Sequence, residues 1–292
     1  MRALKRFVVS IVVLTFAVPA FAGNCFWNIT PSAVAFGTYS VFNTVNTPTT
    51  TNFSFRCTPN QYARLILTTG SSGVYLPNRT MASGGNIAKY NVFLDAGGAQ
   101  VWGDTTNGSV SYDVYNSTPF NKDFIDNMYG IMPNSQDLPA GTYTDTLFAT
   151  LQYSNNINGP WNSLAAVSVA VSATVLAECR VDAFNIDFGN YNPFSVAAVN
   201  QSTLFKVYCT KNSSPTSVSL NSGSFPVGAQ KRMMSAAGAF LNYTAVLGST
   251  AGSSTSSLVP INNGFALNGV LAAQQDVATG LYQDTLVATV NY

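Results

Sequence analysis

The chain has 292 residues, of which 9% are charged and 47% are hydrophobic, and it contains no histidine. The lack of histidine excludes Ser-His-Asp and Cys-His catalytic systems and removes the commonest metal ligand. Lys and Arg number 13 against 12 Asp and Glu, so no positive field exists to attract nucleic acid. Charged residues usually make up about a quarter of a soluble domain, so this composition suits a protein packed against others.

The first 22 residues predict a secretory signal peptide. Basic residues occupy three of the first six positions, an apolar run extends from Phe7 to Val18, and a small-residue cleavage site ends at Ala22. A membrane anchor is the alternative, but the run is shorter than the roughly 20 residues that a spanning helix needs. Cleavage removes three of the 13 basic residues and none of the 12 acidic ones, so the exported chain has a net charge of −2.

After this leader the sequence is a tandem repeat of one unit. A cysteine, a Phe-Gly-x-Tyr step and a second cysteine recur in order, and block 79–94 matches 232–247 as block 141–153 matches 280–292. We therefore expect a first domain over 23–162 and a second over 177–292, each about one domain in length. Cysteines of exported proteins usually form disulfides, and the repeat selects one pairing of the three possible: Cys25–Cys57 and Cys179–Cys209.

Both copies have the pattern of β-structure. Block 141–153 alternates apolar and polar residues, a period of two that is typical of a half-buried strand. Turn residues recur throughout, and no stretch keeps a helical period for long. The sequence therefore predicts an all-β fold of two tandem immunoglobulin-like sandwiches.

Apolar turns in the first copy are candidates for a binding surface. The stretch between the two matched blocks is 14 residues longer in the first copy, and the extra residues fall in 115–133. Connectors are normally polar, and functional loops sit on rigid scaffolds. We expect these turns either to form an exposed hydrophobic tip or, for the insertion, to fold back as a short helix over the sandwich end. The candidate residues are Val74, Tyr75, Leu76, Phe120, Phe124, Ile125, Met128, Tyr129, Ile131, Met132, Ile157 and Trp161.

The segment between the copies, 163–176, contains a further predicted strand. After the turn-rich stretch that follows Tyr153, residues 165–175 alternate cleanly, with Val167, Val169, Val171 and Val175 on one face. A strand that returns after a hairpin lies antiparallel to the one before it. We expect this strand to close the first sandwich in cis. A strand of the second domain and a plain linker are the alternatives.

The second copy has no equivalent strand after its final block. It ends on the apolar face of that block, so we expect an open groove that accepts a strand from a partner. The expected groove residues are Tyr282, Leu286, Ala288, Val290 and Tyr292. Cys25 follows the predicted cleavage site by two residues, which leaves no segment to donate. Such a subunit accepts a strand without giving one and would end a polymer.

These features resemble the spore coat protein U domain of archaic, Csu-type chaperone–usher pilus subunits. The resemblance rests on the early cysteines, the Phe-Gly-x-Tyr steps, the Arg-x-Met motifs at Arg79 and Arg232, and the terminal Gly-x-Tyr-x-Asp-Thr-Leu blocks. It implies a pilin-type sandwich, a periplasmic chaperone, an outer-membrane usher and a donor strand from the adjacent pilin. It also implies a fimbrial tip position, attachment to an abiotic or host surface, and biofilm formation.

No catalytic site or cofactor site is expected. The cysteine spacings do not suit zinc, and no phosphate-binding loop is present. Asp123 and Asp126 could be paired carboxylates of a glycosidase on spacing alone, but solvated loop residues are the better interpretation. Asp145 and Asp284 occupy equivalent positions, which indicates a structural role. A structural spore-coat or cell-surface coat protein and a pilus shaft subunit remain alternatives to the tip adhesin.

Overall fold

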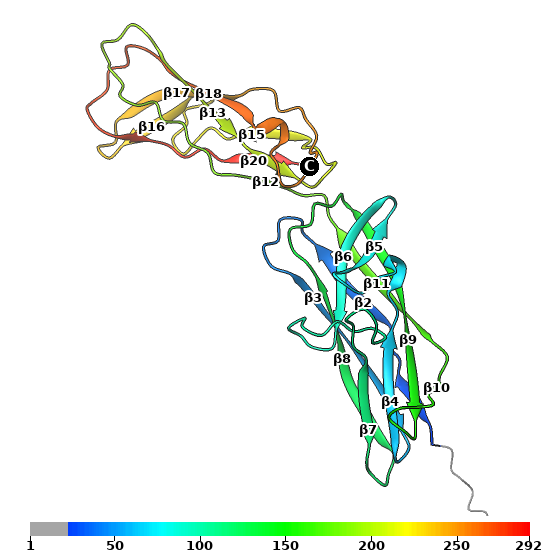
Figure 1. The fold of residues 1–292 in the computed structure, drawn as a ribbon. Helices are drawn as coiled ribbons and strands as arrows, with labels where there is room; N and C mark the ends of the chain where they lie inside the picture. Colours follow the sequence, from blue (N-terminus) through cyan, green and yellow to red (C-terminus); the bar gives the residue numbers. More distant parts are fainter. Residues whose placement is uncertain (1–22) are drawn as a thin grey trace, which may run out of the picture.

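The computed structural model describes residues 23–292, so the predicted signal peptide lies outside the described residues. Within that range the chain forms strands and two short 3-10 turns, η1 (Gly70–Ser72) and η2 (Ile261–Asn263), as two bodies (Figure 1). No helix among these residues is long and apolar enough to cross a membrane. The predicted all-β fold is confirmed, and so are both predicted disulfides, Cys25–Cys57 and Cys179–Cys209.

The first copy is a two-layer sandwich built around one long strand. Its strands are β1 (Cys25–Ile29), β2 (Ala33–Tyr39), β3 (Thr47–Cys57), β4 (Gln61–Leu67), β5 (Arg79–Ser83), β6 (Asn86–Phe93), β7 (Tyr112–Asn116), β8 (Lys122–Met132), β9 (Gly141–Ser154), β10 (Asn162–Ser163) and β11 (Val167–Val175). β1, β3, β8 and the end of β6 form one layer. In the other layer β9 pairs with β4 and β5 along one edge and with β10 and β11 along the other.

β11 lies inside the sheet of the first copy. It pairs antiparallel with β9, from Val167 opposite Ala149 to Val175 opposite Gly141, and parallel with β2. The side chains of Val169, Val171, Ala173 and Val175 are at most 2% exposed and belong to the hydrophobic core of this copy. Among the described residues β11 pairs with no strand of the second copy.

The second copy repeats this plan with shorter strands. They are β12 (Cys179–Val181), β13 (Val199–Phe205), β14 (Val207–Cys209), β15 (Ser217–Leu220), β16 (Lys231–Ser235), β17 (Phe240–Leu247), β18 (Phe265–Leu271), β19 (Tyr282–Gln283) and β20 (Ala288–Asn291). β13, β18, β17, β16 and β19 pair in that order, and β15 pairs with β20. β19 and β20 together match β9, which is one continuous strand in the first copy.

The same carboxylate network occurs in both copies, with Asp145 buried and Asp284 partly exposed. The Tyr90 hydroxyl donates to Asp145 (2.6 Å), whose other oxygen accepts the backbone N–H of Ser71 (2.9 Å). Tyr243, Asp284 and Ser224 repeat these bonds at 2.6 and 2.7 Å. Burial, together with these bonds to carboxylates, raises the pKa of both tyrosines. The predicted structural role of the two aspartates is therefore confirmed.

A glycine makes room for each of these carboxylates. Gly70 and Gly223 both have positive φ, +68° and +85°, and a Cβ at either position would collide with the aspartate side chain. Glycine adopts this backbone region at no steric cost. The local turn is thus part of the same carboxylate network in each copy.

The matched blocks around Arg79 and Arg232 are not equivalent in their pairing. The sequence match pairs Met81 with Met234 and Ala88 with Leu241. In the first copy Met81 lies opposite Ala88, but in the second copy it is Met233 that lies opposite Leu241. The turn of the first hairpin has two residues, between Ser83 and Asn86. The turn of the second has three, because Ser235 pairs with Ala239 through the bond from its N–H to the Ala239 carbonyl. The gap-free match of these blocks therefore hides a shift in register.

Because of this shift, Arg79 and Arg232 lie in different environments. Arg79 is fully buried and donates to the carbonyl oxygens of Thr68 and Trp102, and burial lowers its pKa to about 10. Arg232 instead donates to the Phe225 carbonyl and lies over the ring of Phe240, 3.9 Å from its centre. Only the first arginine acts as a core cross-link between strands and loops.

An acidic substitution in β11 tests how far the first copy depends on this strand. Val169→Asp places an unpaired charge in the core, which costs about 3–5 kcal/mol. The neighbouring Ala170 faces outward, so Ala170→Asp should change stability by no more than about 0.5 kcal/mol. All three tryptophans lie in the first copy, at 27, 102 and 161. Urea unfolding followed by tryptophan fluorescence therefore reports on this copy, and equal midpoints for the two variants would contradict the dependence.

Candidate strand-acceptor groove and distal surface

The second copy contains a groove where β11 lies in the first. Its walls are the segments 184–191 and 277–286, which correspond to β2 and to the start of β9. Two adjoining hollows of about 490 and 360 Å³ follow it, sharing Ile186, Phe188, Met233 and Tyr282 among their lining residues. These four side chains give the groove an apolar floor, while Asp187 and Asp284 belong to its polar lining.

The core residues beneath the groove are less covered than their counterparts. Tyr143 and Leu147 are fully buried under β11, whereas Tyr282 and Leu286 are partly exposed. Val34 on β2 is also fully buried, and its counterpart Ile186 is partly exposed. A strand with apolar residues at alternate positions would cover all three, as β11 does in the first copy.

The backbone on both sides of the groove lacks a pairing strand. In the first copy β2 pairs with β11 along five residue pairs. The second copy has no equivalent of β11, and residues 185–191, the counterpart of β2, do not form a strand there. Across residues 23–292 no strand pairs with the groove side of 280–288. Unpaired edges recruit further strands.

The groove differs in extent from the one the sequence predicts. Tyr282 and Leu286 line it, but Ala288, Val290 and Tyr292 do not. In the first copy β11 covers β9 only from Gly141 to Ala149, so the counterparts of later β9 residues lie at or beyond the end of the groove. The opposite wall was missed, although the alternating Phe184, Ile186 and Phe188 beside the Phe-Gly-x-Tyr step give a signal for it.

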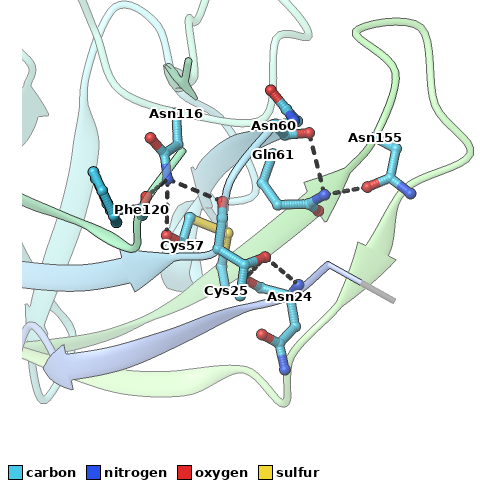
Figure 2. Close-up of a disulfide and its surroundings, with 9 residues drawn as sticks. Asn24, Cys25, Cys57, Asn60, Gln61, Asn116, Phe120 and Asn155 are labelled. Carbon is cyan, nitrogen blue, oxygen red and sulfur yellow. Dashed lines mark hydrogen bonds between the residues drawn. A yellow bond between two sulfur atoms is a disulfide. The ribbon is translucent and has the colours of Figure 1, made fainter. Parts of the chain in front are cut away.

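At the far end of the first copy, a buried amide holds a loop against the disulfide. β9 starts at Gly141, opposite the last residue of β11, so its other end and the loops beside it lie away from the second copy. The Asn116 amide donates to the carbonyl oxygens of Cys57 (3.0 Å), Thr58 (3.0 Å) and Phe120 (2.9 Å), as Figure 2 shows. We call loops 58–60, 117–121 and 155–161 the distal surface.

Two predicted residues project from the distal surface. Phe120 is 75% exposed and Ile157 is 59% exposed. Loop 155–161 is held by Gln61, which donates to the side chain of Asn155. Trp161, in the same loop, is partly buried under the guanidinium of Arg64, 4.7 Å from its ring centre. Tyr115, which was not among the predicted residues, is 40% exposed and stacks on Tyr62 at this end.

The predicted loop at 115–133 is wrong for most of its length, and so is the helix alternative. The extra residues form β7 and the first part of β8, which pairs with β3 over its whole length. Phe124, Met128 and Met132 point inward and are at most 8% exposed. They are core residues and cannot contact a surface. A charge at Met132 would therefore unfold the first copy.

The remaining candidates do not gather on the distal surface. Ile125 is 73% exposed but lies on the outer face of β8, and Tyr129 and Ile131 are only partly exposed on that face. Val74 and Leu76 are 46% and 44% exposed in a turn level with the middle of β9, while Tyr75 is buried and donates to the Leu67 carbonyl. The structure therefore places Phe120, Ile157 and Trp161 at the same end of the first copy.

Asp123 and Asp126 do not form a carboxylate pair. They lie on opposite faces of β8, because their separation of three residues places alternate positions on opposite sides. Asp123 accepts two hydrogen bonds from Arg56, and these bonds together with one from Asn28 lower its pKa to about 2. Among residues 23–292 no group of three acidic or cysteine side chains is placed to hold a metal ion.

Comparison with known proteins settles the family. The family model of the Spore Coat Protein U domain matches residues 11–150 and 165–289. The chain belongs to this family. Membership in it places the protein among pilus structural subunits, not among enzymes. No protein with a curated description matches the sequence.

Several solved structures show a distant similarity to this chain. The CsuC–CsuE chaperone–tip adhesion subunit complex of Acinetobacter baumannii gives a TM-score of 0.48 at 18% identity, covering 92% of this chain and 100% of that one. The CupB6 tip adhesin of Pseudomonas aeruginosa gives 0.36 at 12% identity, covering 91% and 94%. The CooA pilin subunit of enterotoxigenic Escherichia coli gives 0.35 at 14% identity, covering 52% and 97%.

A peptide with the sequence of β11 tests the groove. Residues 165–175, added as a free peptide to the full chain, should bind in the second copy and protect the amides of 280–288 from hydrogen exchange. Leu286→Asp should weaken this binding at least tenfold, because it places a charge on the apolar floor. Val246→Asp, at a position 62% exposed on β17, is the control. Binding that survives Leu286→Asp unchanged would show that the peptide lies elsewhere.

Proposed function

We propose that the protein is the tip adhesin of a chaperone–usher pilus. The observation that carries this proposal is the contrast between the copies, because the first holds its own strand β11 and the second leaves the matching groove open. The groove would receive the N-terminal strand of the adjacent pilin by strand addition. Membership in the Spore Coat Protein U domain family supports the role of a pilus subunit.

The predicted cleavage site after Ala22 supports the tip position within this proposal. β1 begins at Cys25, directly opposite Cys57, and residue 23 already packs against Gln61. If the signal peptide is removed after Ala22, only two residues precede β1, too few to fill a groove. A subunit of this kind accepts a strand and donates none, so it occupies the end of the fibre.

The other partners follow from the same open edge. An apolar groove with unpaired backbone aggregates unless it is covered before assembly. A periplasmic chaperone would cover it, and an outer-membrane usher would exchange the chaperone for the pilin strand. The assembled subunit would then lie outside the cell, with the distal surface facing an abiotic or host surface and supporting biofilm formation.

Immunogold electron microscopy of intact cells tests the position in the fibre. Antibody against residues 23–160 should label only the distal ends of thin fibres. Label along the fibres would assign the protein to the shaft, and label over the whole cell or spore surface would make it a coat protein. Either of these results would overturn the tip assignment.

Adhesion by the distal surface is tested with a matched pair of isoleucines. Burying a large apolar side chain against a surface stabilises binding by about 1.5–3 kcal/mol. Ile157→Asp should therefore reduce the retention of cells on a hydrophobic surface at least tenfold, and Phe120→Asp should do the same. Ile87 is 60% exposed, against 59% for Ile157, but lies in the β5–β6 hairpin near the second copy.

Ile87→Asp is consequently the control and should leave retention unchanged. Fibre numbers are counted by microscopy in each strain, so that lost adhesion is separated from lost assembly. Equal retention for Ile157→Asp and Ile87→Asp, with normal fibres, would remove the distal surface from the mechanism.

A further inference from the structure

The junction between the two copies shows how a domain docks after its strand has filled a groove. β11 ends at Val175, and five residues later the guanidinium of Arg180 lies over the ring of Phe42, 5.3 Å from its centre. The same guanidinium lies 4.6 Å from the ring centre of Tyr208 in its own copy. Glu178 accepts hydrogen bonds from the Val41 N–H (3.0 Å) and the Ser40 hydroxyl. The turn that follows β2 is thus one landing site for the domain that follows β11, and Asp137, which accepts hydrogen bonds from Ser257, is another.

The second copy presents the same turn at the exit of its groove. In the first copy the N–H of Asn43 bonds to the Ser40 carbonyl, and the N–H of Phe42 bonds to the Ser40 hydroxyl (both 3.2 Å). In the second, Ser195 bonds in the same way to the Asn192 carbonyl (3.1 Å) and Phe194 to the Asn192 side chain (3.0 Å). Phe194 is therefore the structural counterpart of Phe42.

Phe194 differs from Phe42 in that nothing covers it. Phe42 is partly buried against the core of the first copy and under Arg180, whereas Phe194 is 89% exposed, the highest value among the large apolar side chains of residues 23–292. The preceding residues Tyr191 and Pro193 line the groove itself. An exposed aromatic ring thus stands at the end of the groove from which a bound strand would emerge.

We propose that Phe194 is the docking site for the domain that follows the donor strand in the adjacent pilus subunit. This proposal rests on the proposed function, because it needs the groove to be filled by that strand. The strand would run parallel to 185–191, as β11 runs parallel to β2, and would leave the groove beside Phe194. The partner would place a cation, five residues after its last groove-bound position, over the face of the ring.

The backbone bond of the first junction cannot recur. Position 193 is proline, which has no N–H, so the bond that Val41 gives to Glu178 has no counterpart. The Asn192 side-chain oxygen accepts the Phe194 N–H, while its amide nitrogen can still donate to a carboxylate. An acidic residue before the cation would therefore make one hydrogen bond fewer than Glu178 does, whereas the cation–ring contact can recur unchanged.

Two synthetic peptides separate this contact from the groove. The short peptide covers residues 165–175, and the long one covers 165–182 with Cys179→Ser, so that it adds Glu178 and Arg180. Binding of each to the full chain is measured by fluorescence anisotropy. The long peptide should bind about two- to fivefold more tightly than its Arg180→Ala version. Glu178→Ala in the long peptide should leave this Arg180-dependent advantage in place.

A variant of the protein completes the cycle. Phe194→Ala should leave the short peptide's affinity unchanged and abolish the advantage that Arg180 gives the long one. An advantage that persists in Phe194→Ala, or no advantage at all while the short peptide binds, would overturn the docking site and leave the groove intact. Failure of the short peptide to bind would remove both the groove and the docking site.

Discussion

Every part of this molecule depends on how one sheet edge is paired. A backbone edge next to an apolar groove is stable only when another strand supplies its hydrogen bonds and covers the groove. In the first copy β11 does both, and β2 is a strand because β11 lies beside it. In the second copy the same two walls face each other across an open groove, and the wall that matches β2 has no regular pairing.

The sequence was sufficient for the duplication, the disulfides and the strand at 165–175, because each depends on covalent order or a clean period of two. The sequence did not predict strand β8, because apolar residues occupy both its inward and its outward positions. Asp126 and Gly130 interrupt the inward series of Phe124, Met128 and Met132, so no alternation is visible. Gly130 is required there because a Cβ would collide with Val34 and Thr49, a tertiary contact that the local sequence does not encode.

The groove could be only half predicted for a related reason. The wall at 280–286 has a clear alternating pattern, but the opposite wall, 184–191, lies almost a hundred residues away and forms no regular element by itself. The register shift between the two arginine motifs has the same origin, because turns of two and three residues follow similar sequences. In each case the missing information was the position of a distant backbone.

The position of β11 in the chain also decides how the first copy carries tension. Loop 155–161 of the distal surface precedes β11, and the second copy follows β11 after only three residues, so a pull between these two ends runs through the backbone of β11 itself. Nine residue pairs with β9 hold this strand in the sheet along its length. The strand that fills the sandwich is therefore also the covalent path by which load passes from the distal loop to the second copy.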